Sequence, residues 1–204
     1  MRNHHRRSQN LSEAQGQVLV KLARHTLMDR LGKQIPQAEI DSLSSALKDS
    51  CFKSPCGTFV TLKINGRLRG CIGNLTADTP LSSGVRRNAI NAAFHDPRFA
   101  PLGTSELDRV EIEISILSEP QPLKYRDGDD LVKKLRPHID GVIIRKDHAS
   151  ATFLPQVWEQ LPRPQDFLAH LCMKAGLGAD SWQNPELEVS TYQVQYFEEH
   201  IGRS

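Results

Sequence analysis

Residues 57–75, GTFVTLKINGRLRGCIGNL, decide the fold of this chain. The Asn65-Gly66 pair is the strongest short signal for a β-hairpin, and apolar residues alternate with polar ones on both sides of it. Strands normally exclude glycine, because glycine loses more backbone entropy than other residues and packs nothing. Gly70 and Gly73 in the second strand therefore indicate that a ligand or another backbone segment approaches this strand closely.

The length of the hairpin loop decides which side chains face the core. A two-residue loop would bury Arg67 and Arg69 among the apolar residues of the first strand. A three-residue loop with Gly66 in a left-handed conformation avoids this, so we predict the three-residue loop. The predicted core face then consists of Val60, Leu62, Leu68, Gly70 and Ile72, and the opposite face of Thr61, Lys63, Arg67, Arg69 and Cys71. The thiol therefore lies beside an arginine and points away from the core.

The rest of the chain alternates predicted helices with predicted strands. Capping signals and apolar periodicity predict five helices, over residues 12–31, 38–48, 79–94, 131–135 and 167–175. Polar and apolar alternation or β-branched content predicts strands over residues 110–116, 141–145, 151–154 and 186–197. Hairpins that alternate with single helices indicate an α+β fold, with a mostly antiparallel sheet flanked by helices.

Length and composition exclude several classes of protein. A chain of 204 residues with 38% hydrophobic and 25% charged residues matches one globular domain, or two small lobes that share a core. The net charge of +2 gives no footprint for nucleic acid. Basic residues crowd only residues 1–10, which we interpret as a disordered tail before a single domain over residues 11–204. No apolar run approaches the roughly 18 residues that cross a membrane, and a secretion signal is missing, so we expect a cytoplasmic protein.

The four cysteines do not suggest a metal centre. We expect Cys51, Cys56, Cys71 and Cys172 to be free thiols, because the cytosol is reducing. Cys51 and Cys56 lack the spacing of a zinc knuckle, and the histidines lack HxH or HExxH spacing. We therefore assign no metal, and the sequence leaves the cofactor open.

Cys71 is the candidate nucleophile or redox thiol. Arg69, two residues earlier, is a cation that could stabilise a thiolate. The alternative is that Cys71 is simply a small packed side chain. Gly70, Gly73 and Asn74 are candidate ligand contacts, since exposed backbone N–H groups suit an anion. The alternative for the glycines is a β-bulge or the crossing of a helix.

Residues 95–99, HDPRF, form a second candidate site after the third predicted helix. They place a base, an acid and a cation close together. Arg98 is the candidate contact for an anionic ligand, with His95 and Asp96 beside it. The alternative is structural: His95 interacts with the helix dipole, and Asp96 turns the chain before Pro97.

Taken in order, these segments resemble the AMMECR (AMME chromosomal region) domain family. Residues 68–73, LRGCIG, are similar to its signature, and further similar blocks occupy residues 89–102, 106–118, 140–142, 153–157 and 171–182. The resemblance implies an α+β fold with two lobes around a cleft near the signature. Prokaryotic members are known as protein A of the AmmeMemoRadiSam system. Their genes commonly accompany a Memo-type protein, related to extradiol dioxygenases, and a radical SAM enzyme.

Three hypotheses for function follow, in order of preference. The first is an enzyme or catalytic component that acts on a small anionic substrate through residues 68–73, with Cys71 as the reactive thiol, Arg69 lowering its pKa and Arg98 holding the substrate. The second is a non-catalytic binding module that docks a Memo-type or radical SAM partner. The third is nucleic-acid binding through the basic tail. The substrate, the reaction and the oligomeric state, including a homo-oligomer, are left open.

Overall fold

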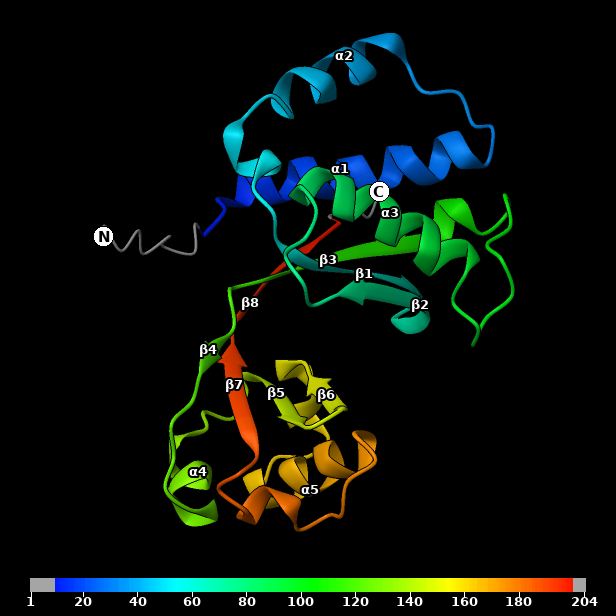
Figure 1. Cartoon of the computed structure of the whole chain (residues 1–204). Coiled ribbons are helices and arrows are strands. Elements are labelled where there is room, and N and C mark those ends of the chain that lie inside the picture. The colour runs from blue at the N-terminus through cyan, green and yellow to red at the C-terminus, as the bar shows by residue number, and fades with distance from the viewer. Residues whose placement is uncertain (1–9, 200–204) are drawn as a thin grey trace. The chain divides into compact units, whose positions relative to one another are not determined.

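The computed structural model describes residues 10–199, so the predicted basic tail lies outside the described residues except for Asn10. The chain divides into two compact units (Figure 1). Among the described residues, unit 1 contains residues 10–117 together with residues 195–199, and unit 2 is Ser118–Val194. Each unit has its own hydrophobic cluster.

Unit 1 packs helices on one face of a four-stranded sheet. Its helices are α1 (Glu13–Arg30), α2 (Gln37–Ala46) and α3 (Leu81–Phe94), with short 3-10 turns η1 (Ser50–Lys53) and η2 (Leu107–Arg109). Its strands are β1 (Gly57–Ile64), β2 (Arg67–Asn74), β3 (Val110–Leu117) and β8 (Val194–Glu198), in the order β2-β1-β3-β8. Figure 1 shows α1 and α3 lying along this sheet, with α2 beyond α1.

Local signals in the sequence place the helices of unit 1 correctly. The predicted capping box starts α1: Ser12 Oγ accepts the Gln15 N–H, and Gln15 Oε1 accepts the Ser12 N–H. α3 ends at Phe94, as predicted. Pro97 disfavours a helical conformation at the preceding residue, Asp96, so the helix must end before it. The predicted apolar face of α3 is buried and consists of Leu81, Val85, Ala89, Ala92 and Ala93.

The β1–β2 hairpin turns through two residues, so the predicted three-residue loop is wrong. Ile64 pairs directly with Arg67. Asn65 and Gly66 both have positive φ angles, of 52° and 73°. This conformation is the type I′ turn, which Asn-Gly favours because both residues tolerate it.

A β-bulge at Arg69 then restores the predicted faces. Lys63 pairs with Leu68 and Leu62 with Gly70, which leaves Arg69 as the extra residue. Beyond the bulge, the core face is as predicted. Leu68 precedes the bulge and pairs with Lys63, so it lies on the face opposite the core, contrary to the prediction. It is 44% exposed.

β3 is buried on both faces. Ile112 and Ile114 belong to the core beneath α1 and α3. Glu113 and Ser115, on the opposite face, are buried as well. The alternation of Glu111 and Glu113 with isoleucines favours one solvated face for this strand, but Glu113 is buried, and its charge is neutralised by Lys63.

Unit 2 packs its helices against a second four-stranded sheet. The helices are α4 (Gly128–Lys134) and α5 (Pro164–Lys174), with 3-10 turns η3 (Pro155–Glu159) and η4 (Ser181–Gln183). The strands are β4 (Gln121–Pro122), β5 (Gly141–Lys146), β6 (Ala149–Phe153) and β7 (Glu188–Tyr192), in the order β4-β7-β5-β6. Trp158 stacks on Phe167 in its core, with ring centroids 3.7 Å apart.

The last predicted strand, residues 186–197, is in fact two strands in two sheets. β7 belongs to unit 2 and β8 to the sheet of unit 1. The chain changes sheet at Gln193, whose C=O accepts the Ser118 N–H and whose N–H donates to Ser118 Oγ. These bonds replace the strand pairing that is interrupted there.

The α+β class and the antiparallel pairing are confirmed. β1 pairs antiparallel with β2 and β3, and β5 with β6 and β7. The two lobes that we expected to share a core have separate hydrophobic clusters, and their union as one domain over residues 11–204 stays a prediction. Within residues 10–199, no helix is both long enough and apolar enough to cross a bilayer, and the cytoplasmic location also stays a prediction.

Candidate functional site

Cys71 lies on β2, the outer strand of the unit 1 sheet, and points away from the core as predicted. It pairs with Thr61 of β1, which pairs in turn with Glu113 of β3. These three side chains form one row across the sheet. Thr61 Oγ1 donates to Cys71 Sγ at 3.3 Å, and Lys63 Nζ lies 2.7 Å from Glu113 Oε2.

The two glycines of the signature segment allow close packing. A Cβ on Gly70 would lie 2.1 Å from the carbonyl oxygen of Ala92 in α3. A Cβ on Gly73 would lie 2.2 Å from the ring of Phe59. Gly70 therefore marks a helix crossing and Gly73 a ring that covers the strand. Their candidate role as ligand contacts stays a prediction.

Asp96 and Arg98 fasten the loop after α3 to the outer edge of β2, and we call this pair the edge clamp. Asp96 Oδ2 accepts the backbone N–H of Cys71 at 2.9 Å and the Nη2 of Arg98 at 2.7 Å. Asp96 Oδ1 accepts the backbone N–H and the Nε of Arg98. Arg98 Nη2 also donates to the Cys71 C=O at 3.3 Å. The edge clamp thus pairs both backbone groups of Cys71 on the side of β2 where the described part of the chain supplies no neighbouring strand.

The two members of the edge clamp differ in exposure. The side chain of Asp96 is 2% exposed, and that of Arg98 is 54% exposed. Hydrogen bonds from the Arg98 guanidinium hold the pKa of Asp96 well below its ordinary value, against the opposing effect of burial. Arg98 therefore stays charged and fixed in position. Its Nη1 has no hydrogen-bond partner in the part of the chain that the structure describes.

Arg69 forms a different ion pair. Its Nε donates to Glu106 Oε1 at 2.8 Å, and its Nη2 donates to Glu106 Oε2 and to the Ala100 C=O. These hydrogen bonds, with one from the Gly103 N–H, lower the pKa of Glu106 to about 2. The side chain of Arg69 is 14% exposed, so this pair mainly ties the bulge of β2 to the loop before η2.

Phe99 lies between the two arginines. Its ring centroid is 5.9 Å from Cζ of Arg69 and 5.5 Å from Cζ of Arg98. Both distances allow a cation–π interaction. Phe99 therefore helps to hold the exposed guanidinium of the edge clamp in place.

The thiol of Cys71 has a raised pKa. Burial is the main cause, opposed by the hydrogen bond from Thr61 and by the charge of Arg98. The carboxylates of Glu113 and Asp96 raise the pKa further. At neutral pH the thiol is consequently protonated.

Arg98, and not Arg69, is the cation that acts on this thiol. We predicted that Arg69 lowers the pKa of Cys71, and this is wrong because Arg69 points toward Glu106. The bulge is the physical reason, since it removes Arg69 from the regular alternation of β2.

Two further candidates lie beside the edge clamp without joining it. His95 is exposed, and its Nδ1 lies 3.1 Å from Asn91 Oδ1 in the last turn of α3. Asn74 ends β2, where its Oδ1 accepts hydrogen bonds from Arg87 Nη2 and Asn88 Nδ2. The structure therefore joins Cys71 to the edge clamp but gives His95 and Asn74 other partners.

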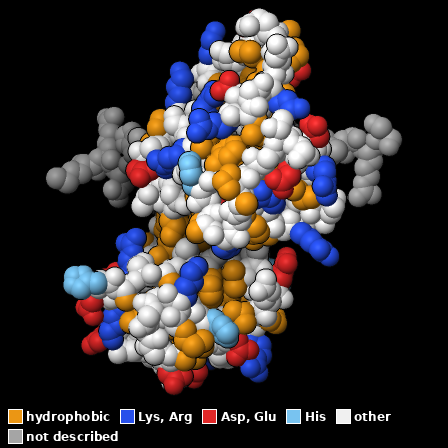
Figure 2. Space-filling model, turned by 90° about the vertical axis from the view of Figure 1, so that its right-hand side faces the viewer, with side chains coloured by type: hydrophobic (Ala, Val, Ile, Leu, Met, Phe, Trp, Pro, Cys, Tyr) orange, Lys and Arg blue, Asp and Glu red, His pale blue; other side chains and the backbone are white. Residues whose placement is uncertain are grey.

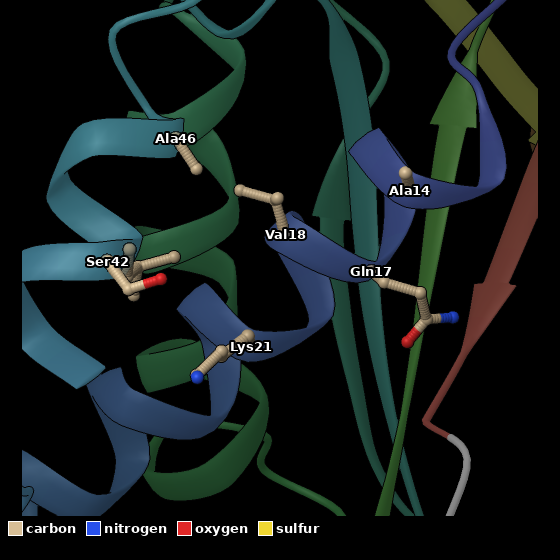
Figure 3. A pocket seen from close by; sticks show the side chains of 7 residues that line it. Ala14, Gln17, Val18, Lys21, Ser42 and Ala46 are labelled. Carbon is tan, nitrogen blue, oxygen red and sulfur yellow. The ribbon is translucent and has the colours of Figure 1, made fainter. Parts of the chain in front are cut away.

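A separate hollow lies in unit 1 between α1 and α2. It measures about 200 Å³ (Figure 3) and is lined by Ala14, Gln17, Val18, Lys21, Ser42, Leu43 and Ala46. The lining contains no cysteine, histidine or carboxylate side chain. This hollow therefore has fewer charged or reactive side chains than the region of the edge clamp and Cys71.

The cysteines are free thiols, as predicted. Among residues 10–199, no three His, Cys, Asp or Glu side chains are grouped so that they could hold a metal ion. The side chains around Cys71 supply a protonated thiol, the hydroxyl of Thr61 and the ion pairs Lys63–Glu113 and Asp96–Arg98.

Comparison with known proteins places this chain in a family. The family model AMMECR1 matches residues 20–197. The chain belongs to the AMMECR1 family. It is 37% identical over 194 residues to a protein from Methanothermobacter thermautotrophicus, which covers 93% of this chain and 96% of that protein. It is 35% identical over 205 residues to a protein from Thermofilum pendens, which covers 93% of this chain and 92% of that one.

A solved structure confirms the fold of this AMMECR1 chain. The crystal structure of an uncharacterized protein from Pyrococcus horikoshii matches it with a TM-score of 0.78 and 31% sequence identity. The match covers 95% of this chain and 96% of that one. The name AmmeMemoRadiSam system protein A stays a prediction.

The sequence alone placed Thr61 and Lys63 on the same face as Cys71, but the predicted three-residue loop would set Phe59 opposite the thiol. The two-residue turn with its bulge sets Thr61 there instead. Glu113 was not predicted beside them, since the pairing of β1 with β3 joins segments about 50 residues apart in the chain.

Proposed function

We propose that this AMMECR1 chain is a binding component that holds a small anionic ligand at Arg98, beside a thiol that stays protonated. The observation that supports the proposal is the edge clamp. Buried Asp96 fixes a guanidinium whose side chain is 54% exposed and whose Nη1 has no hydrogen-bond partner among residues 10–199. A guanidinium that is already held in place loses little entropy when an anion binds to it.

The state of Cys71 favours binding over nucleophilic catalysis. A cysteine nucleophile reacts as the thiolate, whereas burial raises the pKa of this thiol. An anion bound at Arg98 would raise that pKa further, because a second negative charge nearby disfavours ionisation. We therefore prefer a binding role to the enzyme hypothesis in which Cys71 attacks an anionic substrate.

The proposal can be tested by the thermal stability of three proteins with and without anions. Acetate and inorganic phosphate would be compared with chloride at equal ionic strength, for wild type, Arg98→Gln and Arg136→Gln. Arg136 is a matched control in unit 2, because it is 54% exposed and pairs with a buried aspartate. A ligand that binds only the folded state raises its stability in proportion to its affinity.

We expect acetate or phosphate to raise the melting temperature of wild type and Arg136→Gln, and to leave Arg98→Gln unchanged. Equal shifts in all three proteins would mean that the anion acts elsewhere. The absence of a shift in wild type up to 100 mM anion, roughly the affinity range of one charge-assisted contact, would also contradict the proposal.

A second candidate function is the docking of a partner protein, which Leu68 favours. This leucine is 44% exposed and lies between Arg67 and Arg69 on the strand of the edge clamp. The face that contains the β1–β2 turn is drawn in Figure 2, where Lys and Arg side chains lie among hydrophobic ones. Such a surface suits a partner with apolar and acidic groups, and the family resemblance suggests a Memo-type protein or a radical SAM enzyme.

Docking can be tested by co-purification of wild type, Leu68→Ser and Ile139→Ser with both suggested partners. Ile139 is the control, because it is an apolar residue of unit 2 with a similar exposure, 50%. We expect only Leu68→Ser to reduce association, and equal recovery with all three proteins would contradict the idea. Nucleic-acid binding, which we ranked last, depends on residues 1–10, of which the structure describes only Asn10.

A further inference from the structure

The outer edge of β2 continues past the edge clamp to Gly73. β2 is the last strand of its sheet, so no strand formed by residues 10–199 lies along this edge. The Cys71 N–H and C=O point outward along it, because they bond to Asp96 and Arg98. Backbone groups of residues two apart in a strand point to the same side. The N–H of Gly73 therefore points to the outer edge as well.

Two arginines lie on either side of Gly73. Arg98 Nη2 is 3.3 Å from the C=O of Cys71, which precedes Gly73 by two residues. Arg87 Nη2, from α3, is 3.3 Å from Oδ1 of Asn74, the next residue. Both side chains are about half exposed, and each guanidinium keeps an Nη1 with no hydrogen-bond partner among the residues described. One backbone N–H and two guanidinium groups thus belong to, or bond to, residues 71–74 of β2.

We propose that this edge binds a carboxylate, with one oxygen accepting the Gly73 N–H and the other accepting from Arg98 or Arg87. The carboxylate lies where the C=O of a neighbouring strand would lie. The inference rests on the proposed function, because Arg98 is common to both, and it adds the ligand class and the second and third contacts. It also accounts for an arginine on α3 that reaches the end of β2.

The charges around Gly73 select the ligand class. Asp96 neutralises Arg98, and Asp78 lies 4.0 Å from Arg87, so the net positive charge at the edge is small. A phosphate with a charge of about −1.5 to −2 would be repelled by both aspartates. A singly charged, planar carboxylate meets less repulsion and fits the plane of the sheet, as in the capture of peptide carboxylates by backbone N–H groups.

The site can be tested by NMR titration of the full, ¹⁵N-labelled chain with acetate and with inorganic phosphate. The signals to follow are the Gly73 amide and the Arg98 Nε–H, which report the two halves of the site separately. Replacing Gly73 is a poor test, because a Cβ there would clash with the Phe59 ring. The variants are therefore Arg98→Gln and Arg87→Gln, with Arg136→Gln as the control.

We expect acetate to move both signals with one dissociation constant, and at lower concentration than phosphate does. Arg98→Gln should weaken acetate binding about tenfold, as the loss of one charge-assisted contact predicts. Arg87→Gln should weaken it about threefold, since the contact of that arginine is shared with Asn74. Arg136→Gln should leave the binding unchanged.

The outcomes separate this inference from the proposed function. If acetate moves the Arg98 signal and leaves Gly73 unchanged, the carboxylate site is wrong and the proposed function stands. If phosphate binds more tightly than acetate at both signals, the ligand class is wrong. If neither anion moves either signal, both the site and the proposed function are wrong.

Discussion

Each unit contains an aspartate that is almost fully buried and an arginine that is half exposed. In unit 1 these are Asp96 and Arg98, with side chains 2% and 54% exposed. In unit 2 they are Asp140 and Arg136, with side chains 3% and 54% exposed. Both aspartates accept hydrogen bonds from the backbone N–H and from the guanidinium of their arginine.

The two pairs differ in what else they hold. The Asp140 carboxylate bonds to Arg136 within one short loop. The Asp96 carboxylate also accepts the N–H of Cys71, which lies 25 residues away in the sequence. The Asp140–Arg136 pair therefore shapes one loop. The Asp96–Arg98 pair is a candidate site because it also fixes a second segment and places its cation beside a thiol.

The largest loss of stability is expected from disturbing the contact between β2 and α3. The Asp96–Arg98 pair can bond to Cys71 only while β2 keeps this position. In Gly70→Ala, the new Cβ would lie 2.1 Å from the Ala92 carbonyl oxygen, so the backbone must move. We expect a loss of about 3 kcal/mol in the free energy of unfolding, measured with urea. Gly103→Ala is the control, because the nearest atom is an ordinary 3.6 Å away. A loss below about 1 kcal/mol in Gly70→Ala would contradict the close crossing.

The next largest loss of stability is expected from replacing Asp96, with Asp140 as the comparison. Asp96→Asn should reduce the free energy of unfolding by about 2 kcal/mol at pH 7, because it breaks the bonds to Arg98 and Cys71. The pKa of Asp96 is lowered by folding, so its carboxylate stabilises the fold above the ordinary pKa of about 4 and loses this effect as the pH falls below it. The difference between wild type and Asp96→Asn should therefore shrink between pH 4 and pH 2.

Urea denaturation at pH 7, 4 and 3 checks the titration, and hydrogen exchange of the Cys71 amide checks the contact. Asp96→Asn should accelerate that exchange, whereas Asp140→Asn should leave it unchanged. A stability difference that is constant across this pH range would show that Asp96 does not act through its charge.

A smaller effect separates the two arginines near Cys71. Arg69→Gln should lower the free energy of unfolding by about 1.5 kcal/mol, since Arg69 is 14% exposed and binds two loop residues. Arg98→Gln should lower it by about 2 kcal/mol at pH 7, because the carboxylate of Asp96, which is 2% exposed, then stays buried without its ion pair. Thermal denaturation of both variants gives the order. A smaller loss in Arg98→Gln than in Arg69→Gln would contradict the role of Arg98 as the main partner of the buried carboxylate.

Local signals were enough to predict much of the fold. The capping box of α1 and the Asn65-Gly66 turn each depend on residues within four positions of one another. The bulge at Arg69 could not be predicted, because a shorter turn with a bulge and a longer turn without one place Cys71 on the same face. The change of sheet at Gln193 was missed because β7 and β8 together match one long strand pattern.

The candidate site was predicted only in part, because some of its contacts are local in the sequence and others join distant segments. Asp96 and Arg98 are two residues apart, so their proximity follows from the sequence alone. Glu106 is 37 residues from Arg69 in the chain, and only the folded loop before η2 brings the two together. The partner of each arginine, and thus its role, is decided by these long-range contacts.

The most direct test of our account is the pH dependence of Cys71 alkylation, followed by mass spectrometry of the Cys71 peptide in wild type, Arg69→Gln and Arg98→Gln. We predict a midpoint above the ordinary thiol value of about 8.5 in wild type. It should rise further in Arg98→Gln, because the positive charge that lowers the pKa of Cys71 is lost, and stay unchanged in Arg69→Gln. A wild-type midpoint below neutral pH, or one that rises in Arg69→Gln but not in Arg98→Gln, would contradict the assignment of Arg98 as the working cation.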